Sequence, residues 1–226
     1  IMMILGTLMV YRQLDYLRHK DLGFDKEAVI AIKNDNNALS QQLELYKTTL
    51  LADPKISSVS ATLSKPGGLR PLIQVRTEET AADQDLTVAG INVDFDYLKT
   101  MGMEIKAGRN FDPRLQTDST EAIIINKRMI GYLGLPDDPI ESVVEINAGN
   151  GVWQRKKVIG VVEDVNFEPL NRKTEEAFYA HLFPAYSFIL VKLRPGEFAA
   201  GIAKARQTWE QMVPGQPFSY SFIEDD

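Results

Sequence analysis

The chain has 226 residues, of which 25% are charged and 44% hydrophobic, and this ordinary globular balance is sufficient for one large domain or two small ones. Its formal net charge of −6 argues against a nucleic-acid-binding protein, because phosphate recognition needs a basic face. The sequence contains no cysteine, which excludes disulfides and thiol catalysis and makes a zinc site less plausible.

The uncharged run Ile1 to Val10 opens the chain. As a helix it would be about 15 Å long, half of a ~30 Å hydrocarbon core. Because the sequence does not start with Met, we expect residue 1 to be a cut point within a longer protein and the run to be the outer half of a transmembrane helix. Leucines at helical spacing predict that this helix continues as an amphipathic stalk to residue 22, where Gly23 would end it. The expected membrane and stalk positions are Ile4, Leu5, Leu8, Val10, Leu14 and Leu17.

Two other interpretations of this run stay open. A secretory signal core would need a small-residue cleavage site, which the residues after Val10 do not offer. A buried core helix is the stronger alternative, since apolar runs of this length more often have that role. The basic residues that follow the run would favour a cytoplasmic side, although long domains translocate largely regardless of such charges.

Both ends of the remaining chain predict a β-α-β unit. In the first, strands 28–32 and 56–63 flank a helix from Ala38 to Ala52, with Asn36 or Asn37 as its N-cap. In the second, strands 188–193 and 218–222 flank a helix from Glu197 to Met212. We expect the four strands to share one sheet, with both helices on one face. The first helix should bury Leu39, Leu43, Tyr46 and Leu50, and the second Phe198, Ile202, Ala205, Trp209 and Met212.

The stretch between these units predicts a strand-rich insertion with two short helices. The first helical turn, 95–101, should end at Gly102, and the second helix should follow Asn126 as its N-cap and end at Gly134. Expected strands cover residues 72–77, 86–93, 103–106, 122–125, 143–146 and 153–162. Asn150-Gly151 indicates a hairpin between the last two.

Reactive side chains give no convincing catalytic, metal or cofactor site. We interpret His19 as a solvated residue and His181 as a half-buried packing residue. Asp94 and Asp96 flank Phe95 at a strand-to-helix junction, where capping is the simplest role. The remaining candidates are interpreted as solvated strand ends, turns or edge charges: Glu163-Asp164, Glu175-Glu176, Glu224-Asp225-Asp226, Ser64 to Gly68, Gly149 to Gly151 and Arg155-Lys156-Lys157.

Several stretches, in order along the chain, resemble MacB-type ABC transporter permeases of the FtsX-like superfamily. The resemblance lies in residues 13–16 with 20–27, 92–103, 107–111, 122–126, 158–167 and 217–222. One departure is Pro139-Ile140-Glu141-Ser142, where the family usually has Gly after Pro-Ile. The resemblance implies an α+β extracytoplasmic domain: a split β-α-β porter-like layer with an inserted β-rich subdomain, after a transmembrane-stalk helix. We expect residues 1–22 to be membrane helix and stalk, 23–65 and 187–226 the porter-like part, and 66–186 the insertion.

The resemblance further implies a non-catalytic function without cofactors. The domain would lie in the periplasm or outside the cell, attached to the inner membrane, and would pass ATPase-driven helix motion to export of a substrate or to a partner protein. Expected partners are a cytoplasmic ABC ATPase, the lipid bilayer through the first helix, and a second permease copy or a periplasmic protein, but no nucleic acid. The alternative is a membrane-tethered sensor or solute-binding ectodomain, which would hold a small molecule in a defined pocket.

Overall fold

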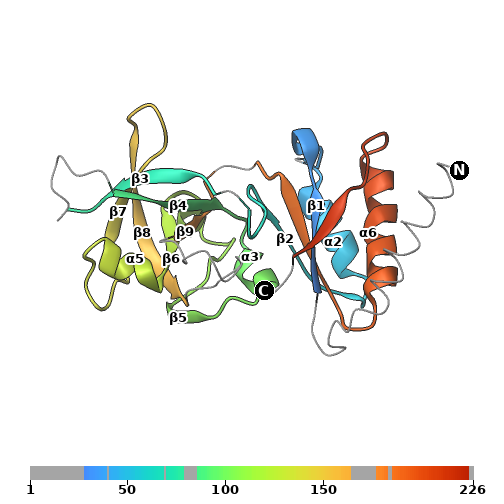
Figure 1. The fold of residues 1–226 in the computed structure, drawn as a ribbon, viewed down its shortest axis with the longest axis horizontal. Coiled ribbons are helices and arrows are strands. Elements are labelled where there is room, and N and C mark those ends of the chain that lie inside the picture. The colour runs from blue at the N-terminus through green and yellow to red at the C-terminus, as the bar shows by residue number, and fades with distance from the viewer. Residues whose placement is uncertain are drawn as a thin grey trace, which may run out of the picture.

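Two β-sheets lie side by side in the computed structural model (Figure 1). It describes residues 28–39, 41–68, 70–78, 86–163, 177–182 and 185–223. The expected stalk positions, Ile4 to Leu17, and His19 lie outside these ranges, as do Asp164, Glu175-Glu176 and Glu224 to Asp226. The transmembrane-stalk helix therefore stays a prediction.

The first sheet unites the two ends of the chain, as the sequence predicted. Its strand order is β11-β1-β10-β2, and every neighbouring pair is antiparallel. The strands are β1 (Ala28–Lys33), β2 (Ile56–Thr62), β10 (Phe188–Leu193) and β11 (Tyr220–Ile223). Chain segments more than 150 residues apart are thus hydrogen-bonded neighbours, because β1 pairs with β10 from Ala28↔Leu193 to Lys33↔Phe188.

Helices α2 (Leu43–Leu51) and α6 (Phe198–Met212) cover one face of this sheet. The apolar stripes expected on them pack with the inner side chains of all four strands in one core cluster. At its centre the rings of Tyr46 and Trp209 meet edge to face, with 6.2 Å between centroids. Their polar atoms are satisfied, because Tyr46 donates to the Ala205 carbonyl and Trp209 to the Gln216 carbonyl.

Helix α2 begins later than the sequence predicted. A 3₁₀ turn, η1 (Asp35–Asn37), precedes it, and Gln42 rather than Asn36 or Asn37 occupies its N-cap position. The Asn34 amide explains the difference: its oxygen accepts from the Leu39 N–H at 3.0 Å, and its nitrogen donates to the Tyr186 carbonyl at 2.7 Å. The Asn34 side chain thus binds the turn locally through Leu39 and ties it to the distant Tyr186 carbonyl.

The second sheet closes on itself. Its order is β5-β8-β6-β9-β4-β3-β7, and an additional pairing of β7 with β8 turns all strands except β5 into a closed ring. The strands are β3 (Leu72–Arg76), β4 (Leu86–Asn92), β5 (Ile105–Gly108), β6 (Ala122–Asn126), β7 (Val143–Asn147), β8 (Trp153–Val162) and β9 (Ala177–Ala180). Closure leaves β5 as the only edge strand among these.

Within the described ranges, three short helices accompany this sheet, one more than predicted. They are α3 (Tyr97–Met101), α4 (Gln116–Thr120) and α5 (Lys127–Tyr132). Helix α4 has no apolar stripe, and strand β9 has only four residues, so neither gave a periodic signal. Asn126 does lie at the N-cap position of α5, but its side chain accepts from the Ala177 N–H and joins β6 to β9 instead.

The basic run Arg155-Lys156-Lys157 is only partly the solvated edge that the sequence predicted. Arg155 and Lys156 pair with β7 alone, and β6 joins β8 only from Lys157 onward. Lys156 is buried, and its ammonium group donates to the Thr120 carbonyl at the end of α4. Only its two neighbours are exposed.

Glu141 occupies the position where the family that the sequence resembles usually has Gly. Its φ of 72° lies in the left-handed region, which glycine adopts without strain. The turn therefore keeps the backbone geometry that Gly permits. An ion pair of 2.7 Å joins the Glu141 carboxylate to Lys157.

Candidate functional site: the junction between the two sheets

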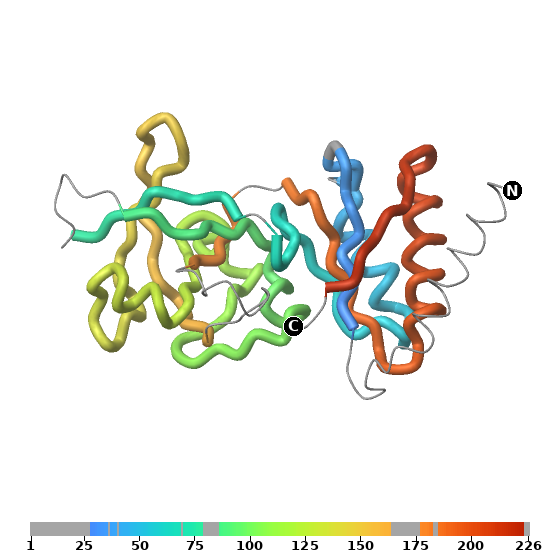
Figure 2. Tube along the Cα trace, viewed as in Figure 1, coloured from blue at the N-terminus to red at the C-terminus, as the bar shows by residue number. Residues whose placement is uncertain are grey.

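The chain enters and leaves the four-stranded sheet at the same end. Strand β1 starts at Ala28, strand β11 ends at Ile223, and Val29 lies opposite Ile223 in the pairing. Figure 2 shows the blue β1 and the red β11 side by side. We call this end of the sheet the exit end.

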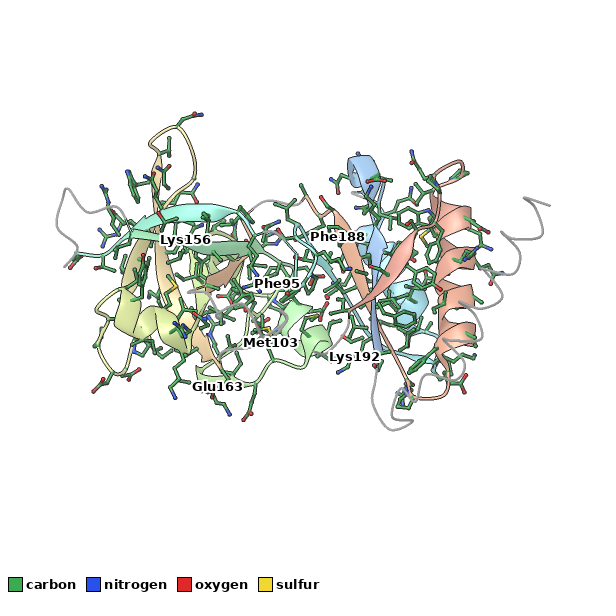
Figure 3. All side chains as sticks on the ribbon, viewed as in Figure 1. Phe95, Met103, Lys156, Glu163, Phe188 and Lys192 are labelled. Carbon is green, nitrogen blue, oxygen red and sulfur yellow. The ribbon has the colours of Figure 1, made fainter. Side chains whose placement is uncertain are left out.

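The other face of the four-stranded sheet is buried too, against the β-rich part of the chain. Ala31 and Leu190 join Tyr97 and Leu98 of α3 and Met103 in a second core cluster. Phe188 packs against the same cluster from β10, and Figure 3 shows it at the junction together with Phe95. With cores on both faces, this sheet cannot bend without disrupting packed side chains.

Hydroxyl groups line the part of the junction where α3 crosses β2. The Ser58 and Thr100 hydroxyls are 2.7 Å apart, and Thr62 donates to the Asn92 carbonyl at 3.1 Å. Ser60 lies between them, fully buried, and its hydroxyl has no hydrogen-bond partner. The sequence alternation on β2 predicted a half-buried strand, but these polar residues face the second sheet and not water.

Backbone hydrogen bonds continue this contact beyond α3. The Asp94 N–H donates to the Ala61 carbonyl at 2.9 Å, and the Leu63 N–H donates to the Asn92 carbonyl at 3.0 Å. Thr62 and Val93 form an antiparallel bridge. Val93 and Asp94, the residues directly after β4, are thus held along β2 as a short added strand. We call this two-residue segment the seam.

A buried ion cluster joins α2 to the seam. The Lys47 ammonium lies 2.7 Å from a carboxylate oxygen of Asp94 and 2.7 Å from one of Asp96. The Lys47 and Asp94 side chains are only 6% and 5% exposed, whereas Asp96 is 45% exposed. Such a cluster fixes geometry, since each buried charge needs its partner in place.

The pKa shifts of Lys47 and Asp94 have the directions expected of two groups that depend on one another. Burial raises the pKa of the Asp94 carboxyl to about 6, although Lys47 acts in the opposite direction. Burial by itself would lower the pKa of Lys47, but the two carboxylates raise it above its ordinary value. Lys47 and Asp94 therefore face each other as a charged pair at neutral pH.

The sequence did not reveal this cluster. Capping was the role expected of Asp94 and Asp96, yet no side-chain cap bond is made to α3, and both carboxylates bind Lys47. Asp94 also accepts from the Asp96 N–H at 3.2 Å. One signal was available: Lys47 lies four residues after Leu43 and so falls beside the apolar stripe of its helix.

His181 has the packing role that its sequence context predicted. It is half-buried, its ring stacks on Phe95 at 5.3 Å, and the Tyr186 hydroxyl lies 2.7 Å from its Nδ1 atom. Burial lowers the pKa of the imidazole, against the effect of a hydrogen bond with the Val93 backbone. His181 is therefore neutral at pH 7, and it lies in the segment that returns from β9 to β10.

Other predicted positions are not brought together. Glu163 is exposed at the end of β8, and the glycines at 67, 149 and 151 adopt positive φ angles in turns. Within the described ranges, no group of three His, Asp or Glu side chains is placed to hold a metal ion. Among the helices of these same ranges, none combines the length and apolar character needed to cross a bilayer.

Arg109 fixes the loop that follows β5. Its guanidinium contacts both carboxylate oxygens of Asp118, which also accepts from the Asp112 N–H at 2.8 Å. Burial would raise the pKa of Asp118, but the bond from Arg109 and the one from the Asp112 backbone hold it below its ordinary value. Asp118 thus stabilises the loop in its ionised form.

We expect Asp118→Asn to weaken the acid sensitivity of the fold. Because the native pKa is lowered, the contribution of the carboxylate is complete above the unfolded pKa of about 4 and is lost as pH falls through the native value. The difference in melting temperature between wild type and Asp118→Asn should therefore be constant from pH 5 to 8 and shrink below about pH 4. A difference that does not change across this acid range would contradict the assignment.

The fold and its junction define a two-part α/β domain, and no catalytic centre is recognisable among the residues that the structure describes. The structure is similar to the periplasmic region of MacB from Actinobacillus actinomycetemcomitans, with TM-score 0.62 and 13% identity over 91% of this chain and 93% of that one. It is also similar to the extracellular domain of the noncanonic ABC-type transporter YknZ from Gram-positive bacteria (TM-score 0.58, 16% identity, 88% and 100% covered). A third similar structure is a domain of a putative permease protein from Porphyromonas gingivalis (TM-score 0.56, 15% identity, 88% and 90% covered).

Residues 1–207 match the family of MacB-like periplasmic core domains, and the chain belongs to this family. It is therefore an extracytoplasmic domain of an ABC-type transporter permease, as the sequence resemblance implied. No curated protein matches the sequence.

Proposed function

We propose that the domain transmits ATPase-driven motion of membrane helices to a substrate or partner protein outside the membrane, without chemistry of its own. The observation that carries this proposal is the exit end, where the chain enters on β1 and leaves on the adjacent β11. Two membrane helices attached there would act on neighbouring strands of one sheet. A displacement of either helix then reaches the whole sheet through its hydrogen bonds.

The junction supports the proposal because it couples that sheet to the β-rich part. Lys47, the hydroxyls of β2 and the second core cluster all cross it. Two chain segments, 63–71 and 181–187, connect the sheets covalently. The expected boundaries of the insertion, between residues 65 and 66 and between residues 186 and 187, fall in these segments. We retain these boundaries as a proposal.

The partners follow from this function. A cytoplasmic ABC ATPase would drive the membrane helices, and the bilayer would hold the helix that includes Ile4, Leu5, Leu8 and Val10. Leu14 and Leu17 would lie on the apolar face of the stalk that joins this helix to β1. A second permease copy or a periplasmic protein would receive the motion.

A break in the stalk tests the proposal. Leu14→Pro removes a backbone donor and costs about 3 kcal/mol or more locally, whereas Leu14→Ala keeps the helix and serves as control. In the reconstituted permease with its ATPase, we expect Leu14→Pro to retain ATP hydrolysis and lose export, and Leu14→Ala to retain both. The melting temperature of the isolated domain should hardly change. Export at the wild-type rate in a correctly inserted Pro variant would overturn the proposal.

A sensor or solute-binding ectodomain is the alternative, and it requires a pocket. The hollow lined by Lys65, Arg70, Tyr97 and Tyr179 has a volume of about 10 Å³. This is room for roughly one water molecule. This hollow is therefore too small to hold an organic solute.

A further inference from the structure

Hydrogen-bond donors surround the small hollow beside the connection from β2 to β3. The polar residues of its lining are Ser64, Lys65, Arg70, Tyr97 and Tyr179. Pro66 and Ile91 complete the wall, so none of the described residues that line it carries a carboxylate. Tyr97 belongs to α3 and Tyr179 to β9. The hollow therefore lies between the covalent connection and the β-rich part.

Tyr97 stands out among these residues because it is almost completely buried. It is 2% exposed, and its ring lies beside that of Tyr179, with 5.9 Å between the centroids. Its hydroxyl nevertheless makes no hydrogen bond to any other residue that the structure describes. Buried hydroxyls nearly always have a partner, so a small ligand in the hollow would complete this one.

The protonation state of Tyr97 suits a donor. Burial raises the pKa of its hydroxyl above the ordinary value, and Tyr179 acts in the same direction, whereas Arg70 acts against both. The hydroxyl is therefore protonated at neutral pH and has a hydrogen to donate. The effect of Arg70 also shows that its guanidinium lies near this hydroxyl.

A tight turn holds Lys65 at the rim of the hollow. The Gly68 N–H donates to the Lys65 carbonyl at 2.9 Å, and Gly67 after Pro66 has the positive φ of 75° that a type II turn requires. Lys65 is half-buried, and it forms no ion pair within the described ranges. A cation in this position is electrostatically incomplete, since partial burial weakens its hydration.

We propose that the hollow binds a single halide ion, with chloride as the common one. The Tyr97 hydroxyl donates to the ion, while Lys65 and Arg70 balance its charge through charge-assisted contacts. The volume of about 10 Å³ accommodates a particle of about the size of a water molecule. A monatomic anion meets this limit, whereas phosphate and sulfate are too large.

A bound ion would connect Lys65, on the covalent connection, to Tyr97, on α3. It would thus add a contact between the two parts of the chain beside the seam. The inference goes beyond the transmission proposal and does not depend on it. A hollow without a halide would leave the expected effect of Leu14→Pro in the permease unchanged.

Thermal unfolding of the purified 226-residue chain tests the site. Sodium chloride or bromide is titrated against sodium gluconate at constant ionic strength, so that screening of surface charges stays equal. We expect a saturable rise in melting temperature, of roughly 3–6 °C once the halide reaches ten times its dissociation constant. Crystals grown in bromide should show an anomalous peak in the hollow, within hydrogen-bond distance of the Tyr97 hydroxyl.

Matched variants assign the effect to this site. Tyr97→Phe keeps the buried ring, removes the donor and should lose most of the halide-dependent rise. Tyr132→Phe is the control, because its exposed hydroxyl is 3.4 Å from the Thr87 carbonyl and does not line the hollow. Lys65→Gln removes a charge at the rim and gives a second, independent test should Tyr97→Phe fail to fold.

Equal melting temperatures in halide and gluconate would overturn the proposal. A halide-dependent rise that persists in full in Lys65→Gln and in folded Tyr97→Phe would overturn it as well, since the ion would then act elsewhere. A hollow that holds only water in the bromide crystals would have the same meaning.

Discussion

Asp94→Ala is expected to lower the free energy of unfolding by about 3 kcal/mol, because it leaves the buried Lys47 ammonium with only the more exposed Asp96 and Glu44 as partners. Removal of one member of a buried pair costs about 3–5 kcal/mol. We place this variant at the lower limit because Asp96 remains. In a chain of this size, the melting temperature should fall by roughly 6–12 °C. Thermal and urea unfolding measure the change.

Glu104→Ala is the matched control. Glu104 also binds a lysine, Lys106 at 2.8 Å, but both side chains of this pair are exposed. Exposed pairs contribute little, so the control should melt with the wild type. If Asp94→Ala also melted at the temperature of the wild type, the ion cluster would not hold the junction together.

The architecture of the four-stranded sheet could be predicted because its signals are local and periodic. The helical stripes and alternating strands at the two ends specify the same β-α-β pattern, and matched patterns favour one layer. The strand order and the closed ring of the second sheet could not be predicted. Sequence periodicity shows which face of a strand is buried, but not which strand lies next to it.

The candidate site was missed for a related reason. Ser58, Ser60 and Thr62 have the alternation of a solvated strand face, and only the second sheet, packed over them, makes them buried. Asp94 and Asp96 were correctly placed at a strand-to-helix junction, but their partner, Lys47, lies on another helix, 47 residues before Asp94. A long-range ion pair leaves no periodic trace in a single sequence. The exit end was likewise unforeseen, since it depends on the register between β1 and β11.

Gly160→Ala is expected to cost about 2–3 kcal/mol, because the backbone that directly follows β5 occupies the space that a side chain would need. Gly160 lies in β8, in a stretch that carries the family resemblance. A Cβ atom there would come within 2.4 Å of the Arg109 carbonyl oxygen, well inside contact distance. Backbone atoms cannot rotate away as a side chain can. The pairing of β5 with β8 would have to shift, and with it the loop fixed by Arg109 and Asp118.

Gly131→Ala provides the comparison. Gly131 is exposed within α5, and an added Cβ would have nothing within 4 Å. Alanine in a helix should then stabilise by about 0.5–1 kcal/mol, through the smaller entropy loss on folding. The same chemical change thus has opposite expected signs at two glycines, and urea unfolding of both variants measures them together. If Gly160→Ala proved as harmless as Gly131→Ala, β5 could not lie as close to β8 as the pairing between Gly108 and Gly160 requires.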